Sequence, residues 1–176
     1  MRKLFVLLCY SGALLFLVSA CGNTDEDASD STNTAVGLGQ RFIEELYSVD
    51  NSSFDYNGMT AESLIHAQNE FSSYFTEKEF EELANKRFFL MPLEAASNQN
   101  NTISVQNIEF EKTGGDPEES NSLDFDHSFT LIFKDQEGNE QDKVKIEGQM
   151  TVIDTENGLK IDRYHDSEIP IEKLNH

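Results

Sequence analysis

The sequence predicts an α+β domain in which three N-terminal helices pack on a curved, bulged, antiparallel four-stranded meander. Up to about residue 90 the apolar residues recur at helical spacing, and from residue 102 onward they alternate with polar residues, as in half-buried strands. The spacing changes once along the chain, so the helices and the sheet are expected to form consecutive parts of one layered domain. The stretch 34–176 is long enough to bury one hydrophobic core.

The first two helices are indicated by apolar stripes. The first stripe, which follows the candidate capping residue Thr34, consists of Leu38, Phe42, Ile43, Leu46 and Tyr47. The turn-rich segment 50–58 (DNSSFDYNG) is expected to end this helix. The second helix is expected to begin after Thr60, and its stripe consists of Leu64, Ile65, Gln68, Phe71 and Phe75.

The third helix has the clearest local signal of its start. Thr76 and Glu79 stand at the two positions of a capping box, in which each side chain bonds to the backbone of the other residue. We expect Pro92 to end this helix, because proline cannot donate an intrahelical hydrogen bond. The segment 93–101 (LEAASNQNN) is then expected to be a loop.

The strands are indicated by alternation of apolar and polar residues. In the first strand, over residues 103–112, the apolar phase slips by one residue between Val105 and Ile108, which predicts a β-bulge. The second strand alternates most regularly, and its apolar face consists of Leu123, Phe125, His127, Phe129, Leu131 and Phe133. The inward residues expected in the third strand are Val144, Ile146, Met150 and Val152. The fourth strand follows Asn157-Gly158, which is the strongest short hairpin signal in the chain.

Hairpin turns predict the register of the last three strands. The turn before the fourth strand sets Met150 opposite His165 and puts Arg163 on the same face, and a weaker turn signal at 138–139 sets His127 opposite Met150. The two histidines are then about 10 Å apart across two strand spacings. That is too far for a shared metal ion, because zinc takes its ligand nitrogens at about 2 Å.

Helices followed by a long, bulged antiparallel meander resemble the nuclear-transport-factor-2-like (cystatin-like) superfamily over about residues 36–167. In that superfamily a strongly curved sheet wraps the helices into a cone with a cavity. The resemblance implies that the apolar sheet face lines such a cavity, and the candidate pocket residues are Phe125, His127, Phe129, Met150, Arg163 and His165. Known members include enzymes, ligand binders, partner-binding scaffolds and extracytoplasmic lipoprotein domains, so the fold does not select a function.

His127 allows a functional and a structural interpretation. A polar side chain on an apolar face costs free energy unless it is paired. In an open, wet cavity His127 would bind a ligand or transfer a proton. In a packed core its ring would be satisfied by a backbone carbonyl or a tyrosine hydroxyl.

The N-terminal segment is typical of an export signal. A positive start at Arg2 and Lys3 precedes a largely apolar run that ends in residues 17–21 (LVSAC). This ending closely resembles the bacterial lipobox, and the resemblance implies cleavage by signal peptidase II before Cys21 and lipidation of this cysteine with diacylglycerol and palmitate. Two acyl chains anchor a protein stably to a bilayer. The alternative is an uncleaved anchor helix.

The lipobox implies that residues 1–20 are the signal peptide and that Cys21 anchors the protein to the outer face of the cell membrane. The next residues, 21–33, are polar and acidic, and they are expected to form a disordered tether. The domain itself is expected to cover 34–176.

Composition and motifs exclude several functions. The formal net charge of −20 disfavours nucleic acid and anionic lipid as partners. The two cysteines, Cys9 and Cys21, belong to the signal and its cleavage site, so no disulfide, thiolate metal ligand or cysteine nucleophile is expected. No phosphate-binding glycine loop, nucleophile elbow or HExxH motif occurs, and we expect neither a cofactor nor a metal.

The sequence therefore predicts a membrane-tethered extracytoplasmic lipoprotein that is a non-catalytic module for a small apolar ligand or an envelope protein. Two alternatives stay open. One is a cavity enzyme of the isomerase or hydrolase type that uses His127, and the other is an envelope scaffold protein.

Overall fold

The computed structural model describes residues 24–50, 56–115 and 121–166. The α-helices in this part of the chain are α1 (Thr24–Tyr47), α2 (Ala61–Asn69), α3 (Glu77–Asn85) and α4 (Met91–Gln99). The 3-10 helices are η2 (Tyr56–Gly58), η3 (Glu70–Ser73) and η4 (Phe88–Leu90). The strands are β1 (Thr102–Gly114), β2 (Ser122–Lys134), β3 (Glu140–Thr155) and β4 (Gly158–Asp166).

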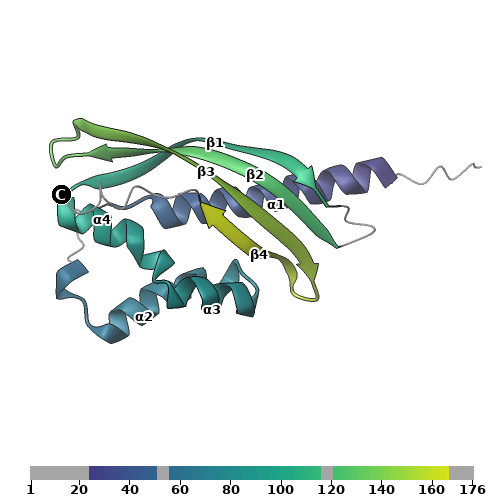
Figure 1. Cartoon of the computed structure of the whole chain (residues 1–176), viewed down its shortest axis with the longest axis horizontal. Coiled ribbons are helices and arrows are strands. Elements are labelled where there is room, and N and C mark those ends of the chain that lie inside the picture. Colours follow the sequence, from purple (N-terminus) through teal and green to yellow (C-terminus); the bar gives the residue numbers. More distant parts are fainter. Residues whose placement is uncertain (1–23, 51–55, 116–120, 167–176) are drawn as a thin grey trace, which may run out of the picture.

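The strands form one antiparallel sheet in the order β1-β2-β3-β4. The helices lie on one face of this sheet, with α1 running along it and α2, α3 and α4 grouped together beside it (Figure 1). The predicted α+β class and the antiparallel four-stranded meander are confirmed. The described residues contain four α-helices, however, and the sequence predicted three.

The longest helix, α1, begins at Thr24 and not near residue 34. Residues 24–33 are helical and are therefore not part of a disordered tether, whereas residues 1–23, with the predicted signal peptide and Cys21, lie outside the described residues. Acidic residues near the start of a helix interact favourably with its dipole, which supports helix in this polar segment. Thr34 is not a cap, because its Oγ1 donates to the Asp30 carbonyl oxygen at 2.9 Å within the helix.

Along α1 the predicted apolar stripe packs into the core. Phe42 and Ile43 are fully buried at its centre, and Tyr47 is buried at its C-terminal end. The helix approaches the sheet closely at Gly39, where a Cβ atom would lie 2.7 Å from Cζ of Phe110. The missing side chain of Gly39 thus permits the contact between α1 and the sheet.

The remaining helices differ from the prediction in two places. No residue of α2 is buried, and Ile65, which was predicted to face inward, is 57% exposed. After α2 the chain continues into η3. The predicted inward residues that are buried in this segment are Phe71 in η3 and Phe75 after it. α4 occupies the predicted loop, because Pro92 stands in its first turn, where a missing N–H costs no intrahelical bond.

Helix α3 begins as predicted, but half of the predicted capping box forms. Oγ1 of Thr76 accepts a hydrogen bond from the backbone N–H of Glu79 at 3.4 Å. Glu79 does not bond back to the cap, because its Oε1 accepts from the backbone N–H of Tyr164 in β4 at 2.8 Å. The backbone N–H of Thr76 also donates to the carbonyl oxygen of Ile161. These bonds tie the edge of β4 to the start of α3.

The predicted bulge in β1 is confirmed. Gln106 pairs with Thr130 and Glu109 pairs with Ser128, so β1 has one residue more than β2 between these pairs. Asn107 adopts the left-handed conformation with φ of 54°, which asparagine tolerates better than most residues.

The register of β2 and β3 is shifted by two residues from the prediction. His127 pairs with Gly148 and not with Met150. The connecting loop is longer than expected, because Oδ1 of Asp135 accepts hydrogen bonds from two backbone N–H groups of the loop at 2.9 Å each. A shift by two residues leaves every side chain on its predicted face of the sheet.

The register of β3 and β4 differs from the prediction in two ways. Near the turn Val152 pairs with Ile161, which is again a shift of two residues from the prediction. Then Thr151 pairs with Arg163, so Asp162 is an extra residue in β4 and forms a bulge. A bulge of one residue moves all later side chains of the strand to the opposite face.

This second bulge overturns part of the predicted pocket. Arg163 and His165 are exposed, whereas Tyr164 and Asp166 are buried. The prediction that Arg163 and His165 share the apolar face with His127 was therefore wrong. The predicted row of His127, Met150 and His165 does not form.

Candidate functional site

His127 belongs to a buried polar cluster, which we define as Tyr47, His127, Tyr164 and Asp166. Nε2 of His127 lies 2.8 Å from Oδ1 of Asp166, and the Tyr47 hydroxyl donates to Oδ2 of the same carboxylate at 2.5 Å. His127 is 3% exposed and Asp166 is 9% exposed. The cluster thus joins the C-terminal end of α1 to β2 and β4.

Gly148 provides the space for this cluster. It pairs with His127 on one side and with Asp166 on the other, so it lies between the two bonded side chains. A Cβ atom at Gly148 would lie 2.2 Å from the carbonyl oxygen of His165 and 2.6 Å from Nε2 of His127. Any larger residue at this position would displace the imidazole or the backbone of β4.

Aromatic rings enclose the imidazole of His127. It stacks on Tyr164 with ring centroids 5.0 Å apart and on Phe129 with centroids 6.0 Å apart. The ring of Phe110 lies 5.8 Å from it in a tilted arrangement. His127 is therefore packed as a core side chain, in agreement with the structural interpretation of this residue.

The hydrogen bonds favour one tautomer of His127. Within the described part of the chain, Nδ1 is buried and has no hydrogen-bond partner. A buried N–H group without an acceptor costs about 1–3 kcal/mol, so a proton on Nδ1 is unfavourable. The arrangement favours a proton on Nε2, which Asp166 accepts.

Burial, and after it the charge of Asp166, raises the pKa of Tyr47 well above the ordinary tyrosine value of 10.0. The same two causes raise the pKa of Tyr164. Both hydroxyl groups therefore stay protonated at neutral pH. The cluster offers hydrogen-bond donors around one carboxylate and no phenolate that would act as a base.

The inner face of the sheet is densely packed. Three of the predicted pocket residues, Phe125, Phe129 and Met150, are each 1% exposed. A cavity between α4 and the sheet, next to Tyr47 and Ile103, measures about 10 Å³. That volume is about the minimum for one water molecule and is too small for a ligand.

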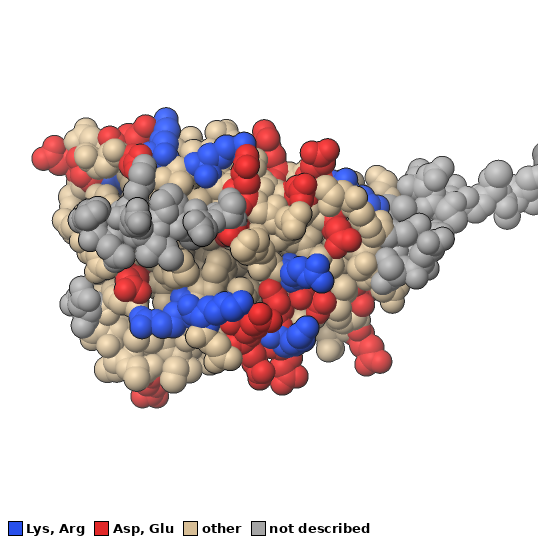
Figure 2. All heavy atoms as spheres, in the orientation of Figure 1, with Lys and Arg blue, Asp and Glu red and all other residues tan. Residues whose placement is uncertain are grey.

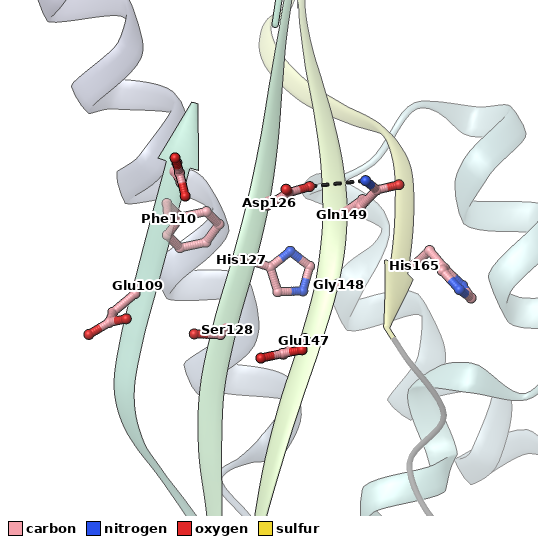
Figure 3. Close-up of a pocket in the computed structure, with 10 residues that line it drawn as sticks. Glu109, Phe110, Asp126, His127, Ser128, Glu147, Gly148, Gln149 and His165 are labelled. Atoms are coloured by element: carbon pink, nitrogen blue, oxygen red, sulfur yellow. Dashed lines mark hydrogen bonds between the residues drawn. The ribbon is translucent and has the colours of Figure 1, made fainter. Parts of the chain in front are cut away.

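A depression of about 750 Å³ lies on the face of the sheet opposite the described helices (Figure 3). We call it the outer depression, and all four strands contribute to it. It is lined by Glu109, Phe110, Glu111, Asp126, His127, Ser128, Glu147, Gly148, Gln149 and His165.

Polar side chains form the walls of the outer depression. Nε2 of Gln149 donates to Oδ1 of Asp126 at 3.0 Å, and Nζ of Lys145 lies 2.6 Å from Oε1 of Glu147. Carboxylates are also spread over the face of the molecule shown in Figure 2, with lysine and arginine side chains between them. No group of three or more potential ligand side chains in the described ranges has the geometry of a metal site.

Sequence reasoning missed Asp166, Tyr47 and Tyr164 as members of the cluster around His127. One signal was present, because the buried residues Ile161 and Tyr164 are three positions apart. The same odd spacing correctly predicted the bulge in β1. Applied to β4, it would have turned Tyr164 and Asp166 inward. The role of Tyr47 depends on a contact between distant segments and had no local signal.

No protein-family model and no curated protein sequence matches the chain. Its fold is similar to a periplasmic fragment of TraM, with a TM-score of 0.52 and 12% identity over 78% of this chain and 97% of that one. It is also similar to an IcmL-like type IV secretion system protein from Legionella pneumophila, with a TM-score of 0.53 and 13% identity over 78% and 92% of the two chains. At this identity the likeness concerns the fold alone.

None of the helices in the described residues combines the length and the hydropathy that crossing a bilayer requires.

Proposed function

We propose that the chain is a lipid-anchored extracytoplasmic lipoprotein whose domain is a non-catalytic module that binds a protein of the cell envelope. The contrast between the two faces of the sheet carries this proposal. On the inner face His127 is bonded to Asp166 and enclosed by aromatic rings. On the outer face a broad polar depression faces away from the described helices.

The fold similarities support an envelope location. One similar structure is a periplasmic fragment, and another belongs to a type IV secretion system. In our proposal the outer depression is the exposed surface through which the domain binds its partner. We also retain the relationship to the nuclear-transport-factor-2-like superfamily as a proposal, supported by the order of helices and strands and by the bulge in β1.

The lipobox supports the anchor. In this proposal the signal peptide 1–20 is removed, and Cys21 carries diacylglycerol and palmitate at the outer face of the cell membrane. Because α1 begins at Thr24, the domain follows the anchor after a short connection. The domain would therefore sit close to the bilayer, where envelope proteins are the available partners.

Other functions have less support. Catalysis by His127 would need a substrate within reach of the imidazole, and the residue is 3% exposed with its ring covered by aromatic side chains. A small apolar ligand would need an interior cavity far larger than the one of about 10 Å³ beside α4.

The anchor is tested with Cys21→Ser in the native host. A clickable palmitate analogue should label the wild-type protein, and the variant should lose both the label and its retention in the membrane fraction. A fully processed variant that stays in the membrane would overturn the proposed anchor.

The partner is tested with a photo-crosslinking residue placed at Gln149, in the outer depression. The matched control carries the same residue at Glu81, which is exposed on α3. The proposal expects one discrete heteromeric adduct from position 149 in the membrane fraction, and no such adduct from position 81. No adduct from position 149, or the same adduct from both positions, would contradict the proposal.

A further inference from the structure

We propose that the outer depression docks an extended, lysine- or arginine-bearing segment of a protein partner. This inference rests on the partner-binding function proposed above and adds the chemistry of the partner. Three carboxylates from two strands carry it, namely Glu109, Glu111 and Asp126.

The first observation is that few cations lie beside these carboxylates. None of the three forms an ion pair within the described residues. Lys145 is paired with Glu147 and also interacts electrostatically with Glu109, and within the described residues the side-chain bond to Asp126 comes from the neutral amide of Gln149. Two carboxylates of the depression, Glu147 and Glu109, thus share the charge of Lys145, and the negative charge of Glu111 and Asp126 is available to a partner.

The second observation is a like-charge pair across two strands. Glu111 of β1 stands directly opposite Asp126 of β2. Like charges at directly opposed positions of a sheet destabilise it, and a lysine at either position would remove the repulsion. Sites that violate such a local rule are expected where function requires the violation. A cation supplied by a partner would relieve the repulsion in the complex.

The third observation is the shape of the surface. One row of paired residues crosses all four strands, and it consists of Glu111, Asp126, Gln149 and His165. Figure 3 shows Asp126 and Gln149 joined in this row, with His165 at its far end on β4. An extended segment laid along the row would meet carboxylates over β1 and β2 and the hydrogen-bonding side chains of Gln149 and His165 over β3 and β4.

Other occupants fit less well. The described residues do not group their carboxylates and histidines in a metal-binding geometry, which argues against a divalent cation. A second copy of this chain would bring the same carboxylates and a net charge of −20, so it would be repelled. The depression of about 750 Å³ has room for several side chains of a protein segment.

The test uses the lipidated full chain, purified from its host in neutral detergent micelles. The probe is a fluorescent eight-residue peptide of alternating lysine and threonine, and a glutamate–threonine peptide of equal length serves as its counterpart. Fluorescence anisotropy gives Kd at low and at high salt. The wild-type chain should bind the basic peptide more tightly at low salt and should not bind the acidic one.

The variant for this test is Glu109→Gln/Glu111→Gln/Asp126→Asn. Its matched control, Glu44→Gln/Glu81→Gln/Glu156→Gln, changes the net charge equally at exposed positions outside the depression. We expect the first triple variant to weaken binding of the basic peptide by about tenfold and the control by less than about twofold. Equal weakening by both, or no binding by the wild-type chain, would overturn the proposal.

A single variant makes the test independent of folding losses. Glu111→Lys would place a lysine opposite Asp126, so it should raise the melting temperature and yet weaken binding of the basic peptide. A variant that is more stable and binds the peptide as the wild type does would overturn the assigned surface.

The failure of this inference is distinguishable from failure of the proposed function. A heteromeric adduct from position 149 in the host, together with peptide binding that ignores the depression carboxylates, would retain the function and reject the basic partner. A homomeric adduct, or no adduct, would reject the proposed function itself.

Discussion

Asp166 holds the buried cluster together, because its carboxylate accepts hydrogen bonds from His127 and Tyr47. Asp166→Ala would leave both donors buried without an acceptor. Each unpaired buried donor costs about 1–3 kcal/mol, so we expect the free energy of unfolding to fall by about 3–5 kcal/mol. Small domains are stable by about 5–15 kcal/mol, so the variant should be close to its unfolding threshold.

Related substitutions should give a graded series. Asp166→Asn keeps one oxygen acceptor and should cost about half as much as Asp166→Ala. Tyr47→Phe removes one donor together with its need for an acceptor, so it should cost about 1 kcal/mol. In the double variant Tyr47→Phe/Asp166→Ala the two losses should not add, because both residues share one bond.

Urea unfolding followed by far-ultraviolet circular dichroism measures these losses. The matched control is Asp154→Ala, which removes an exposed carboxylate from β3 and should change stability by less than about 0.5 kcal/mol. If Asp166→Ala costs no more than this control, the cluster does not stabilise the fold and the reasoning is refuted.

Further perturbations address the same core. Gly148→Ala should cost more stability in urea unfolding than Gly39→Ala, because its Cβ would meet the backbone of β4, whereas at Gly39 the close atoms are the movable ends of side chains. Burial raises the pKa of Tyr47 and Tyr164, so both stay protonated in the folded protein while the unfolded chain ionises near pH 10. The stability that the two protonated tyrosines give the folded state is therefore fully present below pH 10. Above pH 10, urea unfolding should show that the free energy of unfolding falls by up to about 1.4 kcal/mol per pH unit for each tyrosine. Glu79→Ala should speed hydrogen exchange of the Tyr164 amide in β4, while Glu79→Gln, which keeps the acceptor, should leave this exchange nearly unchanged.

Sequence reasoning correctly predicted the features that depend on interactions between residues only a few positions apart. Thr76 caps α3 because its hydroxyl and the N–H that donates to it are three positions apart. The bulge at Asn107 follows from two apolar residues in conflicting phase on the same strand. Pro92 shows the limit of this reasoning, since proline both ends helices and begins them, and the sequence alone does not distinguish the two roles.

The candidate site was predicted in part, because its members come from distant parts of the chain. His127 was singled out correctly as a polar residue on an apolar face, and it is buried there. Its partner Asp166 was missed because the bulge at Asp162 changes the face of the last four residues of β4. This single bulge, which was not predicted, turns Arg163 and His165 outward and their neighbours Tyr164 and Asp166 inward.

The buried cluster and the outer depression involve neighbouring rows of the sheet, on its opposite faces. The inner row of paired residues across the four strands consists of Phe110, His127, Gly148 and Asp166. In this row the side chains of His127 and Asp166 are hydrogen-bonded on the inner face. Successive residues of a strand point to opposite faces, so the sequence neighbours of this row line the outer depression. Bonds that hold the row in register on the inner face therefore also hold the spacing of the outer carboxylates. A rigid, packed core beneath a charged sheet face is what a binding surface needs, because preorganised groups lose little entropy when a partner binds.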